Sequence, residues 1–258
     1  MNVLLLGSDH QVAQELSGLL DHSRISYQQI ALPSLEETLG DEIISEIETI
    51  QSDSVVFTPQ IPLSRLSFRR RLHLVDMVKT LCGSVSSNNI PFLHLSSSSV
   101  YDGRAKQAYS ETDKPSPVSD MAKVWHRWES IVRKQFQKHI VLRPGWLLGR
   151  ERAYLSSAVK QALGDHAAPD LVTQATGTPV APEEVARAMF AILRQIETGA
   201  RNYGVFHIAS RDVLSSARML ERIAPDSYLN IDVQSKVLNY ELDCQKILRN
   251  FGIQQRSW

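Results

Sequence analysis

The chain has 258 residues, of which 43% are hydrophobic and 22% charged, as is usual for a soluble globular protein. Lys plus Arg and Asp plus Glu each total 28, so no net field attracts nucleic acid or an anionic membrane. Cys82 and Cys244 are isolated and the eight histidines are scattered, so we expect neither disulfides nor a metal site. The apolar start, Val3 to Leu6, is too short for a signal peptide or a membrane span, which favours a cytoplasmic protein.

Short apolar runs alternate with amphipathic segments in the N-terminal part. The run from Val3 to Leu6 is continuous, as expected of a strand buried on both faces of a parallel sheet. Further strands are predicted over 27–32, 54–57, 92–95 and 140–142. The helices between them are predicted over 11–20, 35–50, 63–85 and from about 117. This alternation predicts an α/β, doubly wound parallel sheet of the Rossmann-like type.

Beyond Gly149 the alternation loosens. We expect helices over 154–163, 183–197, 214–223 and 241–251, an extended segment over 168–182 and a strand over 205–208. No linker separates independent domains. The chain is therefore predicted to have a Rossmann-like domain over 1–148 and a smaller C-terminal α/β lobe over 149–258. That lobe is not expected to fold alone, and some of its segments should pack back on the sheet.

The strand over 92–95 leads directly into four serines, Ser96 to Ser99. Open α/β sheets place their ligand crevice at the carboxyl ends of their strands. The helix that begins near Pro117 follows shortly afterwards and can bring further side chains over the same crevice. Any chemistry of this protein is predicted to take place here.

Several stretches, taken together in their order, resemble the motifs of a known family. They are Gly7–Ala13, Leu95–Gly103, Tyr109–Asp113, Leu142-Arg143 with Trp146, Gly177–Ala186 and Leu242–Lys246. With them the chain resembles an extended short-chain dehydrogenase/reductase, and most of all the dTDP-4-dehydrorhamnose reductase (RmlD-like) family. The resemblance implies an NAD(P)-binding fold, a nucleotide-sugar substrate, and catalysis by a hydroxyl residue, a tyrosine and a lysine four residues later. It also implies that 1–148 is a dinucleotide-binding domain, here with a degenerate phosphate loop, and that 149–258 is a lobe of the substrate-binding type.

Ser97 occupies the hydroxyl position of that resemblance. The helix aligns without a gap when Pro117 and Glu129 are matched to the family's proline and glutamate. The tyrosine position then falls on Met121 and the lysine position on Trp125. Neither side chain can transfer a proton to a substrate oxygen or carry a positive charge. These are degenerate catalytic positions.

A rival alignment uses Ser119 and Lys123, which restores a lysine four residues after a hydroxyl group. It loses both anchors and needs an alcohol as the acid, a poor match to acid catalysis near neutral pH. Met121, Trp125 and Trp128 also form one apolar stripe on the helix. Two interpretations stay open for this stripe: packing, in the vacated nicotinamide pocket or a subunit interface, and a site remodelled for another ligand.

The resemblance assigns cofactor contacts to Gly7, His10, Gln11, Val12 and Thr58. His10 stands where the family has a glycine that lets the backbone approach the pyrophosphate. Its ring brings bulk into phosphate space, although a protonated imidazole would assist an anion at this helix terminus. Binding of NADP or NAD is therefore expected to be weakened or absent.

Substrate-type contacts fall by the same resemblance on Ser98, Arg143, Trp146, Gly177 and Pro179. Together these departures predict a non-catalytic, RmlD-like pseudoenzyme with a binding or regulatory role and a nucleotide or nucleotide-sugar cleft. The suggested partners are another protein, a second copy of the chain, or a nucleotide-type ligand, but not nucleic acid or membrane. The alternative is an NAD(P)H-dependent reductase of a nucleotide-linked 4-keto sugar with an unusual proton donor.

Overall fold

The computed structural model describes residues 1–32, 40–59, 67–85, 89–148, 175–215, 218–219 and 238–258. The helix expected over 154–163 and the first part of the extended segment expected over 168–182 lie outside these residues. The helices expected over 35–50 and 63–85 are described as α2 (Asp41–Thr49) and α3 (Phe68–Ser84).

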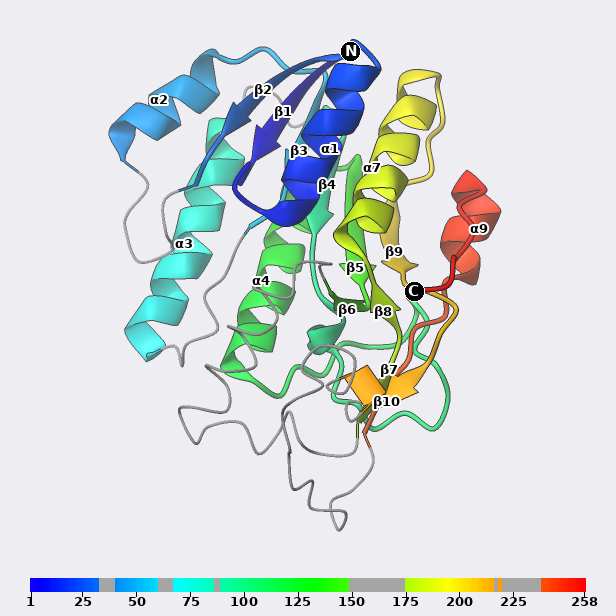
Figure 1. Cartoon of the computed structure of the whole chain (residues 1–258). Coiled ribbons are helices and arrows are strands. Elements are labelled where there is room, and N and C mark those ends of the chain that lie inside the picture. The colour runs from blue at the N-terminus through cyan, green and yellow to red at the C-terminus, as the bar shows by residue number, and fades with distance from the viewer. Residues whose placement is uncertain (33–39, 60–66, 86–88, 149–174, 216–217, 220–237) are drawn as a thin grey trace, which may run out of the picture.

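A six-stranded parallel sheet with the order β2-β1-β3-β4-β5-β9 forms the centre of the molecule (Figure 1). Its strands are β1 (Asn2–Leu6), β2 (Ser26–Ile30), β3 (Ser54–Phe57), β4 (Phe92–Leu95), β5 (His139–Pro144) and β9 (Gly204–Ile208). The order reverses at β1, which pairs with β2 on one side and β3 on the other. The predicted doubly wound α/β fold is thereby confirmed.

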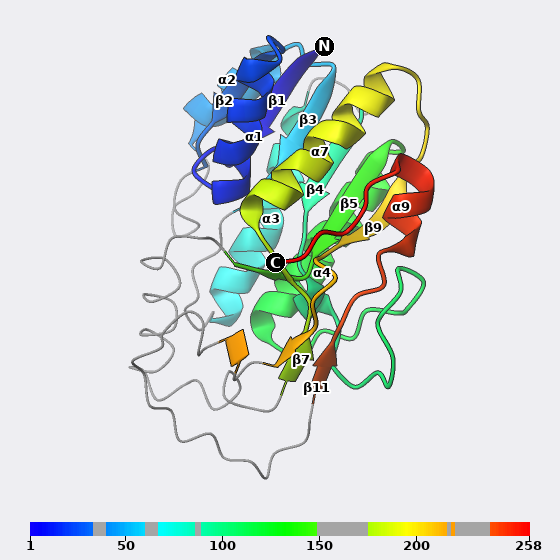
Figure 2. The ribbon, with the colours of Figure 1, turned by 45° about the vertical axis from the view of Figure 1, so that its right-hand side comes forward.

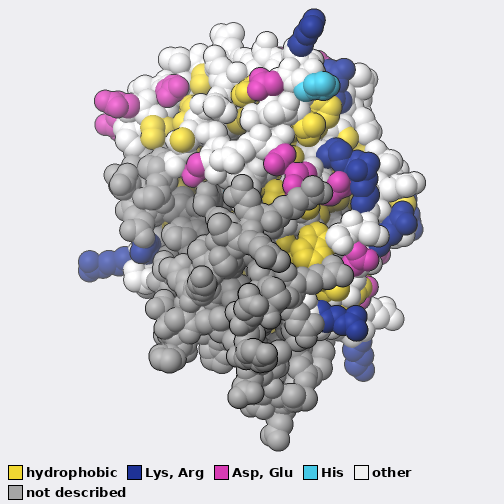
Figure 3. All heavy atoms as spheres, in the orientation of Figure 1, with side chains coloured by type: hydrophobic (Ala, Val, Ile, Leu, Met, Phe, Trp, Pro, Cys, Tyr) yellow, Lys and Arg dark blue, Asp and Glu magenta, His cyan; other side chains and the backbone are white. Residues whose placement is uncertain are grey.

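Helices cover both faces of this sheet (Figures 1 and 2). On one face α1 (Gln11–His22) and α7 (Pro182–Glu197) pack side by side. On the other face α2 and α3 are joined by α4 (Asp120–Gln135). The helix α9 (Gln245–Phe251) lies beside β9 and α7, on the same face as α1 and α7. On the face seen in Figure 3, acidic side chains lie at the upper left, and basic and acidic side chains lie near one another on the right.

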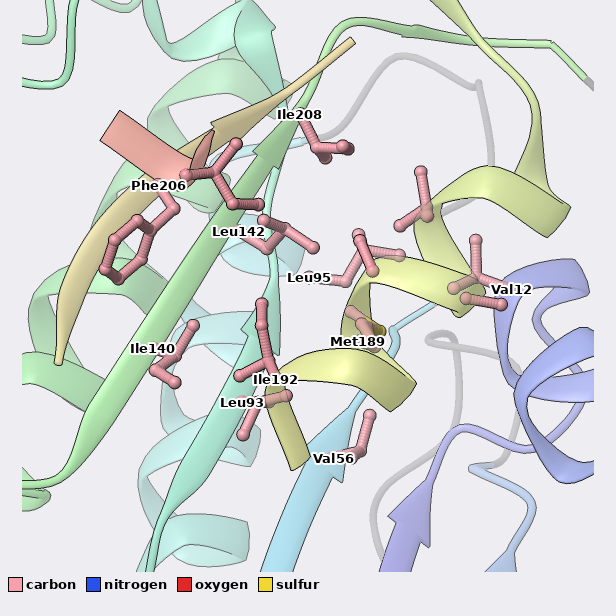
Figure 4. Packing of buried hydrophobic residues seen from close by; sticks show 14 of the residues in the cluster. Val12, Val56, Leu93, Leu95, Ile140, Leu142, Met189, Ile192, Phe206 and Ile208 are labelled. Carbon is pink, nitrogen blue, oxygen red and sulfur yellow. The ribbon is translucent and has the colours of Figure 1, made fainter. Parts of the chain in front are cut away.

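The central strands are apolar along their length because helices bury them from both sides. Every residue of β3 and β4 is buried. Side chains such as Val56 and Leu93 pack with Met189 and Ile192 of α7 in one core cluster (Figure 4). Each such buried aliphatic side chain stabilises the fold by about 1.5–3 kcal/mol relative to exposure.

Two smaller sheets lie below the carboxyl ends of the long strands (Figure 1). One has the order β10-β7-β11 and the other joins β6 to β8. Their strands are β6 (Trp146–Leu147), β7 (Ala175–Gly177), β8 (Pro179–Val180), β10 (Leu214–Ser215) and β11 (Leu238–Tyr240). They connect segments that are far apart in the sequence.

Some predicted boundaries are wrong. Leu214 does not begin a helix; it begins β10, because Leu214 and Ser215 pair antiparallel with Gly177 and Thr176 of β7. The helix expected over 241–251 begins at Gln245. Although α7 and β9 follow residue 149 in sequence, they belong to the main sheet layer. The division into 1–148 and 149–258 stays a prediction.

In the part of the chain that the structure describes, no helix is long and apolar enough to span a membrane. The same residues contain no group of three or more His, Cys, Asp or Glu side chains that could hold a metal ion. Cys82 and Cys244 are both free and buried.

Gly7, at the end of β1, offers a test of this architecture. Its φ is +89°, and an added Cβ would lie 2.3 Å from the carbonyl oxygen of Thr58. We expect Gly7→Ala to lower the free energy of unfolding by about 2 kcal/mol or more. The matched variant Gly18→Ala, in a helix position with open space around it, should raise stability by up to about 1 kcal/mol. Urea denaturation measures both, and equal effects would contradict the described turn.

Candidate functional site

The predicted crevice lies where the central strands end. Gly7 follows β1, Thr58 follows β3, Ser96 follows β4 and Gly145 follows β5. Because parallel strands end at one edge of the sheet, these residues from distant parts of the chain share that edge. The small sheets lie beyond the same edge (Figure 1).

Thr58 ties the end of β3 to the end of β1. Its backbone N–H donates to the carbonyl oxygen of Leu6 at 2.9 Å, and its Oγ1 donates to that of Gly7 at 2.9 Å. Thr58 is wholly buried. The hydroxyl group that the sequence suggested as a cofactor contact is therefore used inside the protein, where it holds the glycine turn in place.

His10 caps the first helix. Its Nδ1 accepts the backbone N–H of Val12 at 3.1 Å, so a donor at the start of α1 is already paired. Burial lowers the pKa of His10 to about 4, so the imidazole is neutral near pH 7. The expectation that a protonated His10 would assist an anion is wrong for that pH. Gln11 begins α1 half-buried, and the Val12 side chain is buried in the core.

These residues fit the pyrophosphate of a dinucleotide poorly. A helix N-terminus binds phosphate through backbone N–H groups that point at the ligand. Here the side chain of His10 takes one of these groups for itself, and its neutral ring adds no charge. The tight turn at Gly7 is present. The residues after it, however, do not leave the backbone N–H groups open to a phosphate as a phosphate-binding loop does.

The serines that follow β4, which form the serine loop, differ in how far they are buried. Ser96 is buried, and its Oγ donates to Glu129 Oε1 at 2.5 Å. Ser97 is half-buried, and its Oγ accepts the N–H of Ser99 at 3.1 Å, which caps the short 3-10 helix η1 (Ser98–Val100). Ser98 is buried with 4% exposure. Ser97 is thus the more accessible of these two predicted contacts.

Ser119 and Lys123, the two residues of the rival alignment, have structural roles at the start of α4. Ser119 is the N-cap, and its Oγ accepts the N–H of Ala122 at 3.1 Å. Lys123 is 55% exposed and pairs with Asp120 at 3.5 Å. Both side chains thus interact within α4 and do not point into the crevice together. This geometry favours the ungapped alignment, which places Met121 and Trp125 at the catalytic positions.

Met121 and Trp125 are half-buried and pack against the core of the face that α4 covers. The Trp125 ring lies 6.1 Å from the ring of His94 on β4 and 5.3 Å, edge-on, from that of Trp128. Trp128 is wholly buried, and its Nε1 donates to the carbonyl oxygen of Leu74 at 3.0 Å. Packing therefore accounts for Trp128, while Trp125 covers β4 at the position of the family's lysine.

Arg143 forms a buried ion pair with Glu129. Its Nε donates to Glu129 Oε1 at 2.8 Å, and its second amino nitrogen donates to Oε2 at 2.6 Å. Both side chains are at most 2% exposed. Burial opposes the charge on Arg143, but Glu129 outweighs this and raises the pKa of the guanidinium. Arg143, predicted to contact substrate, is instead enclosed and engaged within the protein.

A chain of buried hydrogen bonds extends this pair. Arg143 donates to the Tyr101 hydroxyl oxygen at 2.7 Å, and that hydroxyl lies 2.8 Å from His207 Nε2. His207 Nδ1 lies 3.1 Å from the carbonyl oxygen of Asp243, a partner that can only accept. The ring is neutral because burial lowers its pKa to about 3, so Nδ1 donates and Nε2 accepts from Tyr101. Sequence reasoning gave no role to His207 or to Tyr101, although Tyr101 lies within the Leu95–Gly103 motif. The ion pair itself had two signals, Glu129 as an alignment anchor and Arg143 in its own motif, but nothing in the sequence joined them.

The remaining predicted substrate contacts come together. A Cβ on Gly177 would lie 2.5 Å from the indole of Trp146, so only a glycine allows that ring to pack there. Trp146 is half-buried and pairs with Pro179 between β6 and β8. These three residues therefore lie next to one another in the small sheets beyond the carboxyl ends of the long strands.

The order of the parallel sheet and the helices on both of its faces define a Rossmann-like α/β fold, which the solved structures below share. The model of the RmlD substrate binding domain matches residues 70–258, so the chain belongs to that family.

The chain is 23% identical to the dTDP-4-dehydrorhamnose reductase of Aggregatibacter actinomycetemcomitans, over 99% of this chain and 95% of that protein. The structure of a dTDP-4-dehydrorhamnose reductase from Clostridium acetobutylicum matches with a TM-score of 0.75 and 18% identity, over 100% of this chain and 95% of that one. MoeE5, in complex with UDP-glucose and NAD, matches with a TM-score of 0.69 and 17% identity, over 100% and 94%. At such identities the structural matches establish the fold alone.

His94, beneath Trp125, gives a pH test. Burial lowers its pKa to about 4 and outweighs the opposing effects of Glu129 and the Phe57 backbone. Among the described residues, neither ring nitrogen has a hydrogen-bond partner of good geometry. Because the folded pKa lies below the unfolded value of about 6.5, its neutral form supports folding above that pH, and this support is lost toward pH 4.

We expect His94→Phe to keep stability within about 1 kcal/mol of wild type at pH 7, since a ring of similar shape replaces it and no hydrogen bond of good geometry is lost. Between pH 6 and pH 4.5 its stability should fall less steeply than that of wild type, by up to about 1.4 kcal/mol per pH unit. Denaturant titrations across this range measure the slope. An unchanged slope would mean that His94 is not held neutral in the fold.

Proposed function

We propose that the chain is a non-catalytic, RmlD-like protein that keeps a nucleotide or nucleotide-sugar cleft for a binding or regulatory role. One observation carries this proposal: α4 presents Met121 and Trp125 where the family resemblance places the proton donor and the lysine. A thioether cannot act as the acid, and an indole cannot carry the charge that lowers a phenol's pKa.

The phosphate turn supports the same proposal. Hydride transfer needs a firmly bound nicotinamide dinucleotide, and His10 pairs with the N–H of Val12 and places a neutral ring at the terminus of α1. We propose that NADP and NAD bind weakly or not at all. The loss would then affect cofactor binding and proton transfer together.

Two observations support a nucleotide or nucleotide sugar as the ligand. MoeE5, a structural neighbour, has been solved with a nucleotide sugar, UDP-glucose. In this chain, Ser97 remains at the crevice, and Trp146 packed on Gly177 offers a half-buried aromatic ring beyond the strand ends. We propose that a regulatory role would act through a protein partner or a second copy of the chain.

A second candidate is an NAD(P)H-dependent reductase of a nucleotide-linked 4-keto sugar. The observation that favours it is the name of the relatives, several of which are dTDP-4-dehydrorhamnose reductases. It would need Ser119 or an ordered water as the acid. The capping role of Ser119 and the surface pairing of Lys123 count against that arrangement.

Titration with NADPH separates the two candidates. We expect the wild-type protein to give no saturable fluorescence change at submillimolar NADPH. His10→Gly should bind NADPH at least about tenfold more tightly, because it frees the Val12 N–H for a charge-assisted hydrogen bond. The control Glu15→Gly, exposed in the same helix, should leave NADPH binding at the wild-type level. Saturable micromolar binding by the wild type would favour the reductase.

A further inference from the structure

A cavity of about 300 Å³ lies between the first turn of α7, the end of β9 and the C-terminal segment 253–258. This volume is in the range of small-molecule sites. Its lining, as far as the chain is described, includes no residue of the phosphate turn, the serine loop or α4. The cavity therefore lies apart from the phosphate turn, the serine loop and α4, but Leu148 follows the strand that carries Trp146 and Val180 lies in the strand that carries Pro179. Figure 2 shows the C-terminal segment passing beside the start of α7.

The C-terminal segment is fixed in position over this cavity. The N–H of Arg211 donates to the carbonyl oxygen of Arg256 at 3.0 Å. The N–H of Trp258 donates to Asp212 Oδ2 at 2.6 Å. These bonds join the segment to the loop after β9, so the cavity wall exists without a ligand. A pre-formed site avoids the cost of ordering its wall on binding.

One part of the cavity is apolar. Leu148, Val180 and Ile208 line it, and each is buried with at most 5% exposure. Trp258 completes the wall and packs in a small hydrophobic cluster that also contains Leu148 and Trp146. This part can receive an aliphatic or aromatic group.

The rim of the cavity is charged. Glu184 pairs with Arg187 and, at 3.4 Å, with Arg256, so one carboxylate is shared between two guanidinium groups. The two arginine side chains keep 39% and 60% of their surface exposed. The rim therefore retains positive charge, and it lies at the first turns of α7, where the helix dipole also favours an anion. Arg211 adds a third guanidinium group to the hollow on the other side of the segment.

We propose that this cavity binds a small amphipathic anion. Its apolar or aromatic body lies against Ile208 and Trp258, and its carboxylate, sulfonate or phosphate group meets Arg187 and Arg256. Guanidinium groups match such anions with two parallel hydrogen bonds, and both arginines have exposed surface with which to make them.

Anilinonaphthalene sulfonate, an aromatic ring system with one sulfonate, is a suitable probe. We expect the full-length protein to bind one equivalent saturably, with increased probe fluorescence. Arg256→Gln and Arg187→Gln should each weaken binding by about tenfold, the loss of one charge-assisted hydrogen bond. Arg201→Gln removes the same charge from an exposed position outside this lining and should leave the affinity unchanged. Trp258→Phe should reduce energy transfer from tryptophan to the probe.

Each other outcome would overturn the proposal. Failure of the wild type to bind the probe saturably would do so. The same holds if Arg256→Gln and Arg187→Gln bind as tightly as wild type. Equal weakening by all three arginine variants would show only general attraction between a cationic surface and an anion.

Discussion

The buried ion pair of Glu129 with Arg143 is the interaction on which the candidate site depends. Two full charges inside a protein are tolerated only when their geometry is good and their remaining atoms are hydrogen-bonded. Here two parallel hydrogen bonds join the pair, Ser96 donates to the carboxylate, and Arg143 donates to Tyr101. Removing one partner of such a pair typically costs about 3–5 kcal/mol. The pair therefore locks α4 to β5 and to the loop after β4.

This lock determines which side chains α4 turns toward the sheet. Trp125 lies four residues before Glu129, about one helical turn, and Met121 lies one turn further. Both consequently face the core and the end of β4, as their packing shows. Lys123 lies two residues from each of them, about 200° around the helix. It reaches the surface, where it pairs with Asp120. Sliding the helix to bring Lys123 inward would break the buried pair.

Much of the fold follows from local sequence, because a strand buried on both faces must be apolar throughout, as Val3 to Leu6 is. The strand at Leu214 escaped prediction because it exists only through pairing with β7, distant in sequence. The prediction for Arg143 failed for a related reason: an arginine after a buried strand looks available until its carboxylate partner is known. His10 was placed correctly at the helix start, but its neutral state depends on burial that no local pattern reveals.

The central claim is that the protein has a ligand crevice like that of its family but does not catalyse reduction there. The most direct test is oxidation of NADPH by the full-length protein in the presence of dTDP-4-dehydrorhamnose, followed by absorbance for wild type and Ser97→Ala in parallel. The account predicts that both proteins oxidise NADPH no faster than a protein-free control. Turnover by the wild type that Ser97→Ala abolishes would contradict it, because that result requires a working proton donor beside Ser97.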